Sequence, residues 1–114
     1  MTTIKHYDLV IIGGGSAGLA SAISSYEQGV RSILILERDK ELGGILQQCI
    51  HNGFGLHTFK EELSGPAYAQ RFIEKLEELG IDYRLNSMVT HLSETKEIEY
   101  VNPNEGYVRI QAKA

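Results

Sequence analysis

Apolar and polar positions along the first part of the chain predict a strand, a helix and a second strand. Residues 7–12 form a compact apolar run that ends in three glycines, which is typical of a buried parallel strand. Residues 16–28 carry small and apolar side chains at helical spacing, and Gly29 suits the left-handed backbone that ends many helices. Residues 32–37 are a second apolar run, so the three segments together predict one strand–helix–strand unit.

A glycine-rich segment separates this unit from a second helix. Glycines at positions 43, 44, 53 and 55 interrupt residues 43–64, where we expect short helical pieces and exposed loops. Residues 66–79 then place apolar side chains on one face of a helix, with a proline in the first turn and Gly80 at the end. Residues 81–85 predict a third parallel strand.

Three more apolar segments follow, at residues 88–92, 97–101 and 107–111. The sequence Asn-Pro-Asn-Glu-Gly at residues 102–106 supplies turn chemistry between the last two. These segments predict an antiparallel meander. The predicted fold class is therefore α/β, a Rossmann-like domain with a parallel sheet, helices against it and a small antiparallel meander.

Composition and charge exclude several classes of partner. The 114 residues are 42% hydrophobic, which suits one packed domain, and the net charge of −4 comes from 11 basic and 15 acidic residues that are interspersed. No basic stretch could follow a phosphate backbone, so we expect no nucleic acid partner. We expect neither a signal peptide nor a membrane span, and Cys49 has no second cysteine in these 114 residues to pair with. We expect a soluble cytoplasmic protein.

The candidate chemistry lies in the glycine-rich turn from Gly13 to Gly18, which fits the pattern G-x-G-x-x-G between the first strand and the first helix. Gly13 allows a tight turn, Gly15 lets the backbone approach a pyrophosphate, and Gly18 lets the helix pack near the sheet. The free N–H groups and the positive dipole end of the helix then receive the phosphate charge. This geometry predicts a dinucleotide site.

An acidic residue supports this interpretation. Glu37 ends the second strand, where its carboxylate can accept hydrogen bonds from ribose hydroxyls. The alternative is a glycine turn within an unrelated α/β domain, with Glu37 as a solvated strand end. The turn, the helix and the acid serve NAD as well as FAD, so these residues leave the choice of cofactor open.

A second glycine pair, Gly43-Gly44, follows Glu37 after five residues, and this arrangement resembles the extended FAD fingerprint of the glutathione-reductase-type flavoproteins. A meander after a third parallel strand is also typical of these pyridine nucleotide-disulfide oxidoreductase-like proteins. The resemblance implies FAD as the cofactor, with NAD(P) open for a full-length parent. Residues 43–55 are further similar to a bacterial subgroup that oxidises small hydroxy acids, glycerol phosphate or amino acids.

The resemblance also implies a set of cofactor-binding residues. These are Gly13, Gly14, Gly15, Ser16, Ala17 and Gly18 at the diphosphate, Glu37 at the adenosine ribose, Arg38 along the adenine or ribose edge, Gly43 and Gly44 at the diphosphate and ribityl chain, and the backbone of Val89 at adenine. An exposed arginine and an ordinary core valine are the alternatives for Arg38 and Val89. No catalytic residue is assigned, and no metal site is expected.

Further candidates lie between residues 47 and 57. Disulfide reductases of the wider family carry C-x-x-x-x-C after the glycine pair, but Cys49 has no such partner, which excludes dithiol chemistry within the chain. It could cycle through a sulfenic acid or mixed disulfide, or be a small buried residue beside the flavin. Cys49 with His51 makes a poor metal site. His57 could face the flavin or the substrate, or be solvated. Gln47 and Gln48 could donate hydrogen bonds to the isoalloxazine or the ribityl chain.

Some features of the resembled family do not occur in this sequence. An Ala-Thr-Gly-like segment that follows the meander there is missing, and so is a second G-x-G-x-x-G for a nicotinamide domain. We therefore expect residues 1–114 to be an incomplete N-terminal FAD-binding domain, without a substrate domain. Its parent would transfer hydride to or from a small-molecule substrate. The piece alone would bind FAD weakly without turnover. The alternatives are a non-catalytic or truncated FAD- or NAD-binding module, or a fragment of an NAD-dependent dehydrogenase. Dimerisation stays open.

Overall fold

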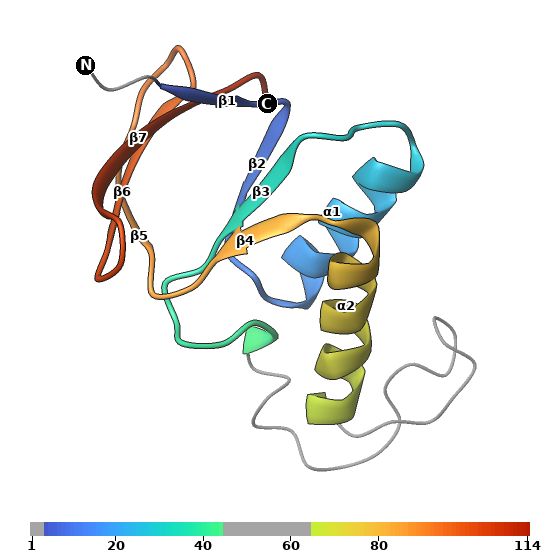
Figure 1. The fold of residues 1–114 in the computed structure, drawn as a ribbon. Helices are drawn as coiled ribbons and strands as arrows, with labels where there is room; N and C mark the ends of the chain where they lie inside the picture. The colour runs from blue at the N-terminus through green and yellow to red at the C-terminus, as the bar shows by residue number, and fades with distance from the viewer. Residues whose placement is uncertain (1–3, 45–64) are drawn as a thin grey trace.

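The computed structural model describes residues 4–44 and 65–114. Within these residues, a parallel sheet forms the middle layer, with its strands in the order β2-β3-β4. The strands are β2 (Leu9–Ile12), β3 (Ile33–Leu36) and β4 (Asp82–Arg84). Two helices, α1 (Ser16–Glu27) and α2 (Gly65–Leu79), cover one face of this sheet (Figure 1). This architecture confirms the predicted α/β fold class.

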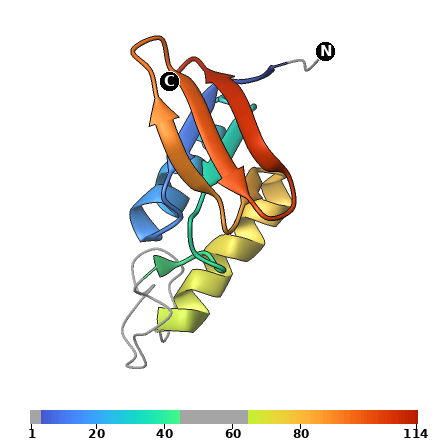
Figure 2. The same ribbon diagram turned by 90° about the vertical axis from the view of Figure 1, so that its left-hand side faces the viewer.

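The second sheet lies on the opposite face of the parallel sheet (Figures 1 and 2). Its strands are β1 (Lys5–Tyr7), β5 (Met88–Leu92), β6 (Glu97–Asn102) and β7 (Gly106–Ala112), in the order β1-β7-β6-β5. The last three pair antiparallel, as the predicted meander requires. The three layers are therefore helices, parallel sheet and meander.

β3 shows why the middle layer is stable. All four of its residues are buried, and successive side chains point to opposite faces of the sheet. Ile33 and Ile35 join the apolar cluster beneath the helices, whereas Leu34 and Leu36 join the cluster beneath the meander. A strand that is covered on both faces needs a continuous apolar run, and this is the pattern that the sequence has.

The helix ends follow the predicted glycines. Gly29 and Gly80 have φ angles of +109° and +74°, a left-handed backbone that glycine adopts without a Cβ clash. The Gly29 N–H donates to the Tyr26 carbonyl at 3.0 Å, and the Gly80 N–H donates to the Glu77 carbonyl at 3.1 Å. Neither α1 nor α2, the helices of the described ranges, combines the length and apolar character needed to cross a membrane.

The expectation of one strand over residues 7–12 was wrong. The chain changes sheets at Asp8, so that Tyr7 ends β1 in the meander sheet and Leu9 begins β2 in the parallel sheet. β1 pairs in parallel with β7, with Lys5 opposite Ile110. The physical reason is that Tyr7, which is 5% exposed, packs into the cluster beneath the meander. One straight strand could not pair with both β7 and β3, because these two strands belong to different sheets.

Candidate functional site

The glycine-rich turn joins the end of β2 to the start of α1. Gly13 has a φ of +109°, and its N–H donates to the carbonyl of Leu36 at 2.8 Å, which holds the turn to the adjacent strand. Gly15 is the N-cap of α1, with φ −75° and ψ −176°. The backbone here therefore has the order of strand, tight turn and helix that the sequence predicts.

Gly18 packs the first turn of α1 against the glycine-rich turn itself. A Cβ at Gly18 would lie 2.1 Å from the carbonyl oxygen of Gly13 and 3.3 Å from Ile11 Cγ2. A Cβ at Gly15, by contrast, would meet no atom of the described residues within 4 Å. The glycine at position 18 is thus needed for internal packing, whereas the side of Gly15 is open for a ligand to approach.

Glu37 connects the glycine-rich turn to the end of β3. Its side chain is 9% exposed, and its Oε1 accepts the N–H of Gly14 at 2.7 Å. Its Oε2 accepts the N–H of Asp39 at 2.8 Å. The carboxylate is therefore held in place by one backbone donor on each oxygen, and the oxygens retain lone pairs for further donors. The sequence placed Glu37 here, but the bond to Gly14 was not foreseen.

The second glycine pair lies against the first. The N–H of Gly43 donates to the carbonyl of Gly14 at 2.8 Å. A Cβ at Gly44 would lie 3.3 Å from the Cα of Gly15, so the two backbones nearly touch. Gly43 and Gly44 both have positive φ angles, +107° and +54°. Two segments predicted from separate parts of the sequence thus meet at the N-terminus of α1.

The backbone donors of this site can be divided by their partners. The N–H groups of Gly13, Gly14 and Gly43 already donate to protein acceptors. The first N–H that closes the helix is that of Leu19, which donates to the Gly15 carbonyl at 2.9 Å. The amides of residues 16–18 precede it and have no intrahelical acceptor.

These amides suit an anion. The first turn of α1 carries no acidic side chain and no side-chain cap to compete for its donors. Free amides together with the positive end of the helix dipole attract phosphate charge. Glu37 supplies acceptors for hydroxyl groups beside them. Together, these N–H donors fit a diphosphate and the Glu37 acceptors fit the ribose of a dinucleotide.

Arg38 and Val89, the two residues predicted to contact adenine, lie outside the two glycine segments. Arg38 is exposed and directly follows Glu37. The N–H of Ser87 donates to the carbonyl of Glu37 at 2.9 Å, which brings the start of β5 beside the end of β3. Val89 follows in β5, partly buried against the cluster beneath the meander, at a point where the pairing with β6 shifts register. The two positions lie in adjoining segments, and their contact with adenine stays a prediction.

The remaining candidates lie outside the described residues. They are Gln47, Gln48, Cys49, His51 and His57. Their predicted roles at the flavin therefore stay predictions.

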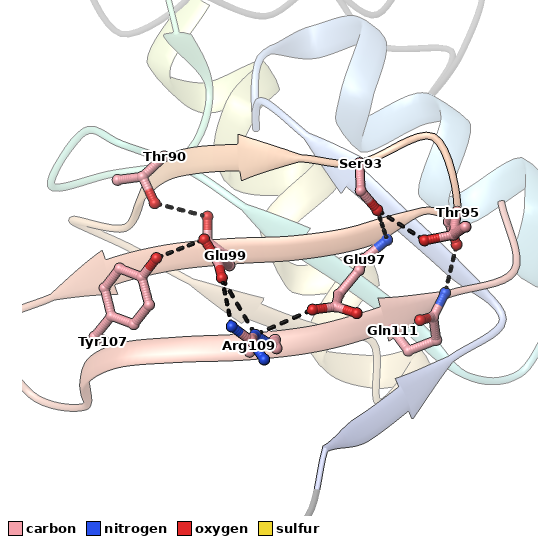
Figure 3. Close-up of polar contacts among 8 residues, drawn as sticks. All are labelled: Thr90, Ser93, Thr95, Glu97, Glu99, Tyr107, Arg109 and Gln111. Atoms are coloured by element: carbon pink, nitrogen blue, oxygen red, sulfur yellow. Dashed lines mark hydrogen bonds and ion pairs between the residues drawn. The ribbon is translucent and has the colours of Figure 1, made fainter.

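Two polar networks belong to the meander instead of the glycine-rich turn. On its outer face, Arg109 lies between Glu97 and Glu99, with its Nε 3.1 Å from Glu97 Oε1 and its Nη2 2.9 Å from Glu99 Oε1 (Figure 3). The Tyr107 hydroxyl donates to Glu99 as well, and this bond together with Arg109 lowers the pKa of the Glu99 carboxyl. The Arg109 side chain is 52% exposed, so its ion pairs with the two half-buried glutamates add little to stability.

The second network closes the turn between β6 and β7. Glu105 Oε1 accepts the Tyr100 hydroxyl at 3.2 Å and the Asn102 amide at 2.9 Å, and it lies 3.3 Å from Arg84 Nε. Asn102 also donates to Ser87 Oγ at 3.0 Å. Tyr100 is 2% exposed. The turn is thereby fixed to β4 and to the start of β5.

We expect Tyr100 to make the fold sensitive to alkaline pH. Burial and the adjacent Glu105 carboxylate raise the pKa of the Tyr100 phenol from 10.0 to about 12. A raised pKa favours the neutral phenol in the fold, so this contribution is complete below pH 10 and is lost as the pH rises through about 12. Urea unfolding measured as the pH rises from 10 to about 12 should show a smaller loss of unfolding free energy for Tyr100→Phe than for the unmodified chain. Equal losses would contradict this account.

Comparison with known proteins identifies the family of this chain. Residues 8–106 match the family described as FAD dependent oxidoreductase. The HcnB subunit of hydrogen cyanide synthase from Pseudomonas protegens is 35% identical over 102 residues, which are 84% of this chain and 20% of that protein. Glutathione reductase from Yarrowia lipolytica is 43% identical over 53 residues, 46% of this chain and 10% of that enzyme.

The fold has relatives among solved structures. L-proline dehydrogenase from P. horikoshii superposes with a TM-score of 0.72 at 23% identity, covering 99% of this chain and 22% of that one. The chain thus spans about a fifth of the length of HcnB and of this dehydrogenase. The similarity to glutathione-reductase-type flavoproteins is confirmed, and FAD is the cofactor that the matching family indicates. The chain belongs to the FAD-dependent oxidoreductase family.

Proposed function

We propose that this chain is the part of a flavin-dependent oxidoreductase that holds the adenosine diphosphate half of FAD. The observation that carries the proposal is the meeting of the two glycine segments. The Gly43 N–H bonds the Gly14 carbonyl, and Gly44 lies against Gly15, directly before the first turn of α1. This arrangement supports a diphosphate beside both segments, where the helix dipole and free amides stabilise its charge.

Within this proposal, each element has a defined role. The amides of Ser16, Ala17 and Gly18 donate to the diphosphate, and Gly15 permits its close approach. Glu37 accepts hydroxyl groups of the adenosine ribose, because its carboxylate is already oriented by Gly14 and Asp39. The N–H of Gly14 orients Glu37, so its contribution to binding is indirect.

The activity of the longer protein is a wider proposal. FAD, when bound, supplies hydride acceptance and donation, and the protein supplies binding and orientation. We propose hydride transfer to or from a small-molecule substrate in a cytoplasmic enzyme. The matching family supports the reaction class, and the lone Cys49 supports the compartment. The 114 residues by themselves are proposed to bind FAD weakly and to lack turnover.

The test is a visible absorption scan of the purified chain before and after addition of FAD and removal of the excess. Flavin bands at about 370 and 450 nm that stay with the protein, as expected of any bound oxidised flavin, support the proposal. Because weak binding can be lost during removal, calorimetric titration with FAD, ADP and NAD accompanies the scan. A chain that binds neither FAD nor ADP, or that prefers NAD to FAD, contradicts the proposed cofactor.

A matched pair of variants assigns any binding to the site. Glu37→Gln removes one charge beside the glycine-rich turn, and Glu94→Gln removes one charge from the exposed loop between β5 and β6. We expect Glu37→Gln to weaken ADP and FAD binding about tenfold, the cost of one charge-assisted hydrogen bond. Glu94→Gln should leave both affinities unchanged. Equal effects of the two variants would place the nucleotide elsewhere.

A further inference from the structure

Leu42 is the one buried side chain in an exposed stretch just before the second glycine pair. Residues 38–41 are all exposed, whereas Leu42 is 2% exposed and belongs to the cluster between the helices and the parallel sheet. The loop that leaves β3 is therefore anchored to the core at this residue. Its position along the chain is next to Gly43.

The same side chain packs onto the first glycine segment. A Cβ at Gly14 would lie 2.5 Å from Leu42 Cδ2, so the leucine methyl occupies the space beside the Gly14 backbone. One residue later, the Gly43 N–H donates to the Gly14 carbonyl at 2.8 Å. Gly14 is thus held by Leu42 on its Cα, by Gly43 on its carbonyl and by Glu37 on its amide.

We infer that Leu42 is a positioning residue of the dinucleotide site, which sets the spacing of the two glycine segments by packing onto Gly14. This inference rests on the proposed function for the identity of the ligand. The packing role of Leu42, which fixes the distance between the two glycine segments, does not depend on that function. A single backbone hydrogen bond, such as the one from the Gly43 N–H to the Gly14 carbonyl, adds only about 1 kcal/mol of net stability. The buried leucine supplies the apolar contact that keeps Gly43 and Gly44 against Gly14 and Gly15.

The test compares Leu42→Ala with Leu76→Ala. Leu76 is 0% exposed and belongs to the same cluster, but it lies on α2. Both variants remove the same atoms from one core, so both should lower the midpoint of urea unfolding. They differ in what the lost side chain contacts.

Amide hydrogen exchange is the first readout, because local and global opening can be separated. We expect Leu42→Ala to raise the exchange rate of the Gly43 amide at least about tenfold more than that of the Ile35 amide in the central strand. In Leu76→Ala, the Gly43 rate should not rise more than the Ile35 rate. If Gly43 and Ile35 change by the same factor in Leu42→Ala, Leu42 is only a core residue and the inference is overturned.

ADP titration is the second readout, at a temperature where both variants are folded. Leu42→Ala should weaken ADP binding about tenfold relative to Leu76→Ala, and Leu42→Met should restore it, since methionine refills the volume. Equal affinities in the two alanine variants would overturn the role in binding. Absence of ADP binding by the unmodified chain would refute the proposed function instead, while the exchange rates would still decide whether Leu42 positions the loop.

Discussion

Replacing Gly18 by alanine is expected to cost the chain about 3 kcal/mol of unfolding free energy, the upper range for forcing extra atoms into a packed site. The added methyl would lie 2.1 Å from the Gly13 carbonyl oxygen. This contact is with backbone, so relief requires α1 to move away from the turn. Urea unfolding followed by circular dichroism measures the loss.

Gly15→Ala is the matched control for this substitution. Its Cβ would meet no described atom within 4 Å, and its φ of −75° suits alanine. We expect a stability change of at most about 1 kcal/mol, the scale of an N-cap substitution. The binding of ADP should nevertheless weaken, because the new methyl would occupy the open side of Gly15, from which we propose that the diphosphate approaches. Similar stability losses in the two variants would show that Gly18 has no special packing role.

Replacing Glu37 by alanine is expected to cost about 3 kcal/mol, because it leaves two backbone donors, the N–H groups of Gly14 and Asp39, without their acceptor. The side chain is 9% exposed, so water cannot fully replace both bonds. Glu37→Gln retains acceptor oxygen on one side and should lose less. Thermal and urea unfolding of both variants give the two free energies.

The critical comparison is between the stability loss of Glu37→Ala and that of an alanine substitution at a surface glutamate. A carboxylate that only contacts ribose would be dispensable without ligand, and Glu37→Ala would then be as stable as the unmodified chain. Glu94→Ala, in the exposed loop, is the reference for removing one surface charge and should change the free energy by no more than about 0.5 kcal/mol. A loss at Glu37 no larger than at Glu94 would contradict the structural role.

Elements with a strong local pattern were predictable from the sequence. The apolar run of β3 and the helical spacing of α1 place these elements within one or two residues of their observed bounds. The division of residues 7–12 between two sheets was not predictable. This division depends on the pairing of Lys5 with Ile110. Residues near Asp8 carry no pattern that indicates a pairing partner so distant in the sequence.

The candidate site divides in the same way. Gly13, Gly18 and Glu37 follow from their spacing, because each has a role that a dinucleotide turn requires. The contacts of Gly14 with Glu37 and Leu42 do not, since the first depends on the register of β2 against β3 and the second on the loop after β3 folding back. One signal was present in the sequence: three consecutive glycines are one more than the motif demands.

The pairing of β1 with β7 has a consequence for the order of folding. β2 and β3 pair across a short interval, with Leu9 opposite Ile33, whereas Lys5 must find Ile110. Closing the longer loop costs more chain entropy. During synthesis at about 5–20 residues per second, the partner of Lys5 emerges on the order of 5–20 s later. The first strand in the sequence is therefore among the last to be paired, and until then Lys5–Tyr7 is open to contact by other chains.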